Sequence, residues 1–88
     1  MSVRGNDWEC FSELVHVHIE AYTVPQYGDK GTDQVTGYTV GECLKQAQKY
    51  ISRYGRNARP GQQELDFLKA AHYIQLAAEK HQEARDVE

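Results

Sequence analysis

The sequence predicts an all-α fold, a small three-helix domain with a long ordered loop between the first and second helices. Apolar residues recur at helical spacing in three stretches of the chain. Residues typical of helix starts and stops lie between these stretches. The chain of 88 residues has the length of one domain, so residues 1–88 are expected to form a single helical unit.

The first helix is expected over residues 7–24. Asn6 is a suitable N-cap, and Glu9 follows three residues later, as a capping box requires. At about 100° per residue one arc of this helix is apolar. The arc holds Trp8, Phe11, Leu14, Val15, His18, Ile19 and Tyr22. Alternate residues of 15–24 are also apolar, so a strand is the open alternative for that segment. Pro25 ends the element in either case.

Residues 25–38 form the predicted loop, which is rich in glycine, aspartate and other turn residues. Loops of this length are usually functional or disordered. We expect this one to be ordered, with Tyr27 packed on the core and Gly28 or Gly31 at positive φ. The candidate loop site consists of Tyr27, Asp29 and Asp33.

The second helix is predicted over residues 40–54. Thr39 and Glu42 form a T-x-x-E capping box at its start, and Gly55 supplies a left-handed stop. Its apolar stripe holds Val40, Cys43, Leu44, Ala47, Tyr50, Ile51 and Tyr54.

The third helix is predicted over residues 61–84, with Pro60 at its start and a frayed tail at 82–88. It carries two apolar patches and a narrow polar arc. The first patch holds Phe67, Ala70, Ala71, Ile74, Ala77 and Ala78. The second holds Leu65, Leu68, His72 and Leu76, and the polar arc holds Asp66, Lys69, Tyr73 and Lys80. A helix apolar on most sides must be covered on most sides, either by the other two helices or by a second copy in a homodimer.

The middle of the chain is basic and both ends are acidic. Residues 39–63 have a net charge of +4, against −4 before them and −3 after them. The basic run 45–59 suggests an anion site, because arginine forks match phosphate oxygens. Its candidate residues are Lys49, Arg53, Arg56 and Arg59, next to the N-terminus of the third helix. A solvated face paired with Glu64 or Asp66 is the favoured alternative.

The sequence gives little support for a metal or cofactor site. Glu13, His16 and Glu20 share a helix face, but this is an incomplete ligand set, and no metal site or cofactor is predicted. His18 and His72 point at apolar arcs and are interpreted as hydrogen-bonded core histidines that could meet.

The two cysteines lack the spacing of a zinc pair. Cys10 and Cys43 are assigned to apolar helical stripes, where a free thiol behaves as a small hydrophobe. A disulfide is not expected in a reducing compartment. The absence of catalytic motifs favours a protein that is not an enzyme. Without an apolar run of about 20 residues or a signal-peptide core, the chain is expected to stay in the cytoplasm.

Three sequence motifs resemble those of a known group of proteins. They are H-I-E-x-Y-T-V-P-Q-Y-G-D at residues 18–29, K-Y-x-x-R-x-G-x-N-x-R at 49–59 and L-K-x-A-H-Y at 68–73. Together they resemble a group of small phage and prophage proteins of unknown function, over roughly residues 15–78. The K-Y-x-x-R-x-G motif is more distantly similar to a broader phage domain. Some of its members occur in nucleotide-metabolism proteins, which implies a nucleotide link. The resemblance implies no catalytic residues.

These observations favour a non-enzymatic phage accessory module that acts through protein–protein contacts, with another protein or a second copy as partner. The alternative is a nucleotide- or phosphate-handling enzyme subunit that uses the basic run 45–59. A nucleic-acid partner ranks third, because the chain is acidic overall. No membrane partner is expected.

Overall fold

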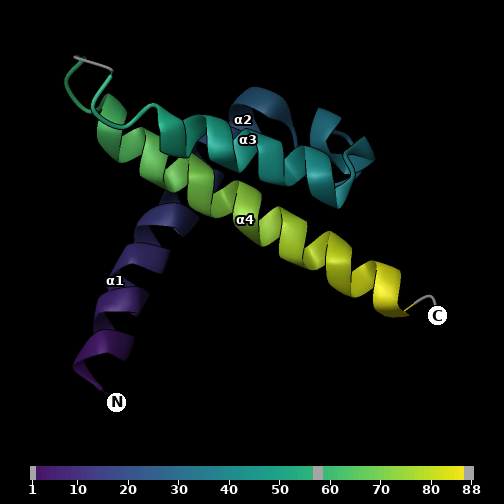
Figure 1. Ribbon diagram of the computed structural model, residues 1–88, viewed down its shortest axis with the longest axis horizontal. Helices are drawn as coiled ribbons and strands as arrows, with labels where there is room; N and C mark the ends of the chain where they lie inside the picture. Colours follow the sequence, from purple (N-terminus) through teal and green to yellow (C-terminus); the bar gives the residue numbers. More distant parts are fainter. Residues whose placement is uncertain (1, 57–58, 87–88) are drawn as a thin grey trace.

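The computed structural model describes residues 2–56 and 59–86, and the elements in these ranges are all helical (Figure 1). In chain order they are α1 (Val3–His18), the π-helix η1 (Ile19–Thr23), α2 (Val24–Tyr27), the 3₁₀ helix η2 (Gln34–Gly37), α3 (Val40–Ser52) and α4 (Gln62–Asp86). The predicted all-α class is confirmed. The strand alternative for residues 15–24 is wrong, because this segment is helical throughout.

The centre of the structure is a hairpin in which α3 and α4 run side by side (Figure 1). The buried apolar residues are all small: Cys43 and Ala47 on α3, and Ala70 and Ala77 on α4. Small side chains let two helices approach closely, and the close contact then excludes water from the seam between them. We call these four residues the small-residue seam.

The second helix begins as the sequence predicts. Thr39 Oγ1 accepts a hydrogen bond from the Glu42 amide at 3.1 Å, and Glu42 Oε1 accepts one from the Thr39 amide at 3.0 Å. This confirms the capping box. Gly55 has a φ of +81°, the left-handed conformation expected after a helix end, although α3 itself ends at Ser52.

The first helix begins and ends differently from the prediction. It starts at Val3, where Ser2 Oγ accepts a hydrogen bond from the Gly5 amide at 3.0 Å, so the predicted Asn6 cap is wrong. Helical structure also continues through Pro25 to Tyr27 and stops at Gly28, whose φ is +101°. Pro25 is tolerated because it lies in the first turn of α2, directly after the π-helix.

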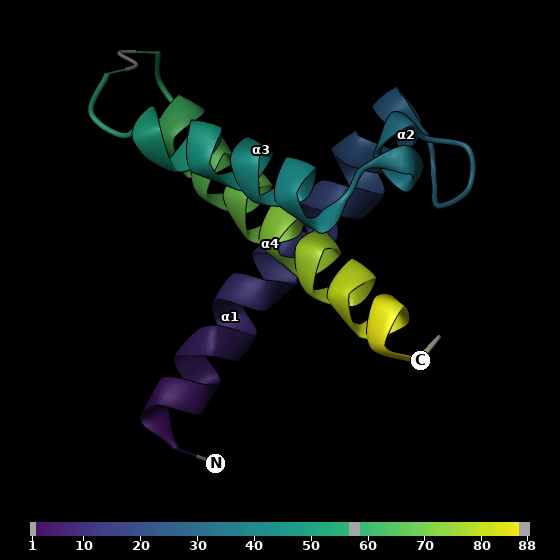
Figure 2. The ribbon, with the colours of Figure 1, turned by 45° about the vertical axis from the view of Figure 1, so that its right-hand side comes forward.

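Most of α1 projects away from the hairpin as an arm, and only its C-terminal end reaches α4 (Figures 1 and 2). The radius of gyration is 14.2 Å. A compact domain of this length has a radius of about 12 Å. The arm therefore makes the chain less compact than a domain that buries its whole apolar surface within itself.

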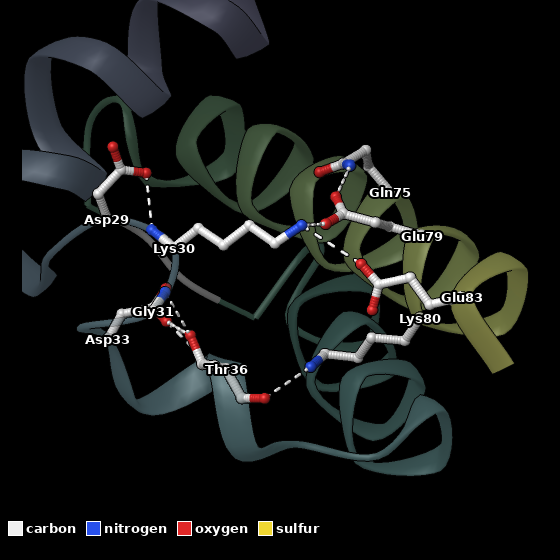
Figure 3. A network of polar contacts seen from close by, with 9 residues as sticks. All are labelled: Asp29, Lys30, Gly31, Asp33, Thr36, Gln75, Glu79, Lys80 and Glu83. Atoms are coloured by element: carbon white, nitrogen blue, oxygen red, sulfur yellow. Dashed lines mark hydrogen bonds and ion pairs between the residues drawn. The ribbon is translucent and has the colours of Figure 1, made fainter. Parts of the chain in front are cut away.

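The predicted loop is tied to α4 by polar contacts (Figure 3). Lys30 Nζ donates to Glu79 Oε1 at 2.6 Å and to Glu83 Oε1 at 3.3 Å. Lys80 Nζ donates to the Thr36 carbonyl at 3.1 Å. Through these contacts the loop is held against α4 between residues 79 and 83. Gly28 and Gly31 have φ of +101° and +92°, as predicted.

The third helix differs from the prediction at both ends. It starts at Gln62, after a left-handed Gly61 with a φ of +79°, so Pro60 lies in the preceding turn. It continues to Asp86, two residues beyond the predicted end, and residues 87–88 of the predicted frayed tail lie outside the described part of the chain.

The predicted polar arc of α4 does not face solvent. Asp66 is 3% exposed, and the Tyr73 ring stacks on Tyr50 of α3 with 5.8 Å between centroids. The reason is the small-residue seam. Because α3 meets α4 through alanine and cysteine, neighbouring polar and aromatic residues of α4 are drawn into the contact.

Enlarging a residue of the seam should separate the helices. We expect Ala47→Leu to lower the free energy of unfolding by about 1–3 kcal/mol, because Ala47 is buried against α4. Ala84→Leu, at an exposed position on α4, is the matched control and should change stability by less than about 0.5 kcal/mol. Urea unfolding followed by circular dichroism measures both, and equal stability of the two variants would contradict the close seam.

Candidate functional site

A cleft of about 400 Å³ opens between the η1–α2 segment, the loop and the α3–α4 hairpin. We call it the tyrosine cleft, because tyrosines from four parts of the chain line it. Its aromatic and charged lining residues are His18, Tyr22, Tyr27, Asp33, Tyr38, Tyr50, Lys69, His72 and Tyr73. Ligand pockets in proteins have volumes of about 300–1,000 Å³, so a small molecule fits.

One wall of the cleft comes from the helical segment that crosses α4. His18 is buried, and its ring stacks on Tyr22 with 5.2 Å between centroids and an interplanar angle of 23°. Tyr27 meets Tyr22 edge to face at 6.1 Å. The π-helix lies between His18 and Tyr27, and π-turns of this kind are frequent at functional sites.

The opposite wall comes from the hairpin and carries positive charge. Lys69 Nζ lies 5.7 Å from the Tyr22 ring centroid and 5.4 Å from that of Tyr50. Arg53 and Lys49 approach the same Tyr50 ring at 5.1 and 5.5 Å. Three cations therefore gather around one tyrosine, at distances suited to cation–π attraction.

Burial favours the neutral form of several lining residues. It lowers the pKa of His18, with a further contribution from Lys69, and it lowers the pKa of His72, with a further contribution from His18. Burial raises the pKa of Tyr73 to about 12. The lining also holds one lysine, Lys69, and one acidic residue, Asp33.

The four candidate anion-binding residues are only partly brought together. Lys49 and Arg53 meet at Tyr50, whereas Arg56 and Arg59 lie in the turn whose residues 57–58 are outside the described ranges. Within those ranges neither Lys49 nor Arg53 pairs with an acidic side chain. The favoured alternative, pairing with Glu64 or Asp66, is therefore wrong for these two cations.

Asp66 is instead enclosed within the hairpin. Its Oδ1 accepts a hydrogen bond from Gln62 Nε2 at 3.0 Å, and its Oδ2 has no hydrogen-bond partner among the described residues. The sequence interpretation missed Lys69, which it assigned to the solvent-facing polar arc. The sequence feature that could have identified Lys69 was its position on the same arc as Tyr73, one helical turn earlier.

The residues of the predicted loop site line two adjoining cavities. Tyr27 lines the tyrosine cleft, Asp29 lines the adjoining cavity next to Lys30, and Asp33 lines both. Tyr27 is 60% exposed, so the prediction that it packs on the core is wrong. Asp33 Oδ1 accepts hydrogen bonds from Thr36, and this shapes the loop beside the cleft.

The histidines and cysteines assigned to apolar helix faces differ in burial. His18 and His72 line the same cleft, where burial and ring contacts hold them, and the predicted hydrogen bonds to their rings are absent from the described structure. Cys43 is buried, whereas Cys10 is exposed, which contradicts its assignment to an apolar stripe.

Of the three residues that shared a helix face as an incomplete metal-ligand set, His16 and Glu20 lie 3.8 Å apart on the surface. Residues 2–56 and 59–86 contain no group of three metal-ligating side chains.

A second surface lies on the other side of the hairpin from the cleft. Phe67 lies two positions before Lys69 and five positions before His72. At about 100° per residue, a rotation of about 140–200° around the α4 axis separates Phe67 from these two residues. The Phe67 ring contacts Tyr54 at 5.7 Å. We call this surface the apolar hairpin face, and its exposed members are Leu44, Ile51, Tyr54, Phe67 and Ile74.

Comparison of the chain with protein-family models, with curated proteins and with solved structures gives no match. Among the described helices, none is both long enough and apolar enough to cross a membrane.

The buried histidines should make stability depend on pH. Folding lowers the pKa of His18 and His72, so the unfolded chain binds more protons than the folded chain. The free energy of unfolding therefore decreases as the pH falls below their ordinary pKa of 6.5 towards the lower folded-state pKa. Thermal melts from pH 8 to pH 5 should show a declining Tm. His72→Gln should make this decline shallower, whereas His81→Gln, at an exposed position, should leave the slope unchanged.

Proposed function

We propose that this chain is a non-enzymatic module that acts through protein–protein contacts, and that a second copy of the chain is the partner its own surface fits. The observation that carries the proposal is the amount of apolar surface left uncovered. The resemblance of residues 18–29, 49–59 and 68–73 to small phage proteins supports placing the module among phage accessory proteins.

The exposed area is larger than a monomer of this mass requires. The chain exposes 6705 Å² at a mass of 10.1 kDa. A compact monomer of that mass exposes about 5,300 Å². The surplus of about 1,400 Å² exceeds the roughly 800 Å² that one partner contributes to a standard interface. Covering this surplus with a second copy would bring the protein to an ordinary surface-to-mass ratio.

Most of the exposed large apolar side chains lie on two surfaces that do not cover each other within one chain. The first is the apolar hairpin face, where Ile51 is 58% and Phe67 is 54% exposed. The second is the α1 arm, where Trp8 is 62% exposed and contacts Phe11 at 5.9 Å. Aromatic side chains dominate interface energies, so Trp8 and Phe67 are the expected anchors.

The α1 arm is long enough to cover the apolar hairpin face of a second copy. The 16-residue α1 is about 24 Å long, enough to span the hairpin face. An arm from each chain placed on the hairpin of the other forms a closed two-fold dimer, the commonest symmetric assembly.

Weakening the hairpin face should dissociate this dimer. We expect Ile51→Ser to raise the dimer dissociation constant at least tenfold, because roughly 1.5 kcal/mol or more of apolar transfer energy is lost. Trp8→Ser should have an equal or larger effect from the arm side. Sedimentation equilibrium over 1–100 µM, a range that brackets a dissociation constant of about 10 µM, measures both.

Gln48→Ser is the matched control, because it also introduces serine at an exposed position of α3 but removes no apolar side chain. It should leave the dissociation constant unchanged. A wild-type chain that sediments as a monomer throughout this range would contradict self-association as the use of the two surfaces.

A further inference from the structure

The tyrosine cleft contains a cation that the protein itself does not neutralise. Lys69 is half-buried, and no carboxylate within the described ranges lies at ion-pair distance from it. Lys30, by contrast, is paired with both Glu79 and Glu83. A partly desolvated ammonium group without an anionic partner favours an anionic ligand, because attraction between charges strengthens as water is removed.

Further positive charge lies at the same end of the cleft. Arg53 and Lys49 approach the Tyr50 ring, which Lys69 also contacts. Asp33 is the acidic residue of the lining, and its Oδ1 is already engaged by the amide and hydroxyl of Thr36. The potential around Tyr50 is therefore positive, and an acidic group at that end meets Lys69, with Arg53 and Lys49 nearby although they do not line the cleft.

The remaining walls are flat and aromatic. The Tyr50 and Tyr73 rings stack at an interplanar angle of 14°, and the His18 and Tyr22 rings stack at 23° on the opposite wall. Planar rings stack favourably on such surfaces.

We propose that the tyrosine cleft binds a planar aromatic anion, a ring compound that carries a phosphate or carboxylate group. The acidic group contacts Lys69, with Arg53 and Lys49 nearby, and the ring lies against the tyrosines. A cationic ligand of the kind held in aromatic cages is disfavoured, because Lys69 already occupies the position of the cation between the Tyr22 and Tyr50 rings.

Four probes separate the contribution of the ring from that of the charge. Adenosine 5′-monophosphate and indole-3-acetate are the aromatic anions, and they distinguish phosphate from carboxylate recognition. Adenosine lacks the charge, and ribose 5-phosphate lacks the ring. Isothermal titration calorimetry should give an affinity for at least one aromatic anion that is tenfold or more above that of both reduced probes. Equal affinity of a reduced probe, or no binding of either aromatic anion at millimolar concentration, overturns the proposal.

The position of the ligand is tested on the wild-type protein, so that folding of a variant is not required. Backbone amide shifts in the titration should be largest at Tyr22, Lys69 and His72. Largest shifts at Arg56 and Gly61 instead would place the anion at the turn between α3 and α4 and overturn the assignment to the cleft.

Charge variants then test Lys69 itself. Lys69→Gln should weaken binding of the aromatic anion about tenfold to a hundredfold, the usual contribution of a hydrogen bond to a charged group. Lys69→Arg should retain most of the affinity. Lys45→Gln removes the same charge from an exposed position of α3 and should have no effect. An unchanged affinity in a folded Lys69→Gln protein would overturn the role of Lys69. Repeating the titration with Ile51→Ser keeps the result independent of self-association.

Discussion

The close contact between α3 and α4 is the constraint on which the rest of the structure depends. Its buried apolar members are Cys43, Ala47, Ala70 and Ala77, and none of them is large. A seam of small residues brings the two helices close together, so the leucines and most aromatic residues of the same elements lie beside the seam rather than in it. Those larger side chains are placed on the two outer sides of the hairpin, where each side must find its own cover.

One side of the hairpin finds its cover within the chain. The helical segment through η1 and α2 crosses it, and the loop follows, held to α4 by Lys30 and Lys80 (Figure 3). The cover is incomplete, because Tyr22 and Tyr50 bound an open space with Lys69 between their rings. The tyrosine cleft is thus a consequence of how a short helical segment crosses a narrow hairpin.

The other side of the hairpin has no cover within the described residues, and α1 projects away from the hairpin as an arm (Figure 2). The two proposals concern these two sides and are physically separate. Self-association uses the apolar hairpin face and the arm, whereas ligand binding uses the cleft. A chain of this size can therefore combine a packing surface and a small-molecule site, because the hairpin is only one helix layer thick.

Local chemistry by itself determined much of this protein. The helical periodicity, the Thr39 capping box and the left-handed glycines all follow from interactions within a few residues, and a sequence displays those directly. The end of the first helix was harder to predict from the sequence. Pro25 stops a helix only when it lies beyond the first turn. Here a π-turn places Pro25 in the first turn of α2, and a π-turn gives no strong sequence signal.

The site was decided by the tertiary structure. Lys69 and Tyr73 have a polar periodicity that places them in solvent when α4 is considered alone. Only the small side chains of a second helix, packed against α4, draw that arc inward. Only a third segment crossing above it brings Tyr22 to Lys69. Contacts between residues so distant in the chain depend on which helix faces meet. Periodicity tells which residues share a face, whereas packing decides what that face contacts.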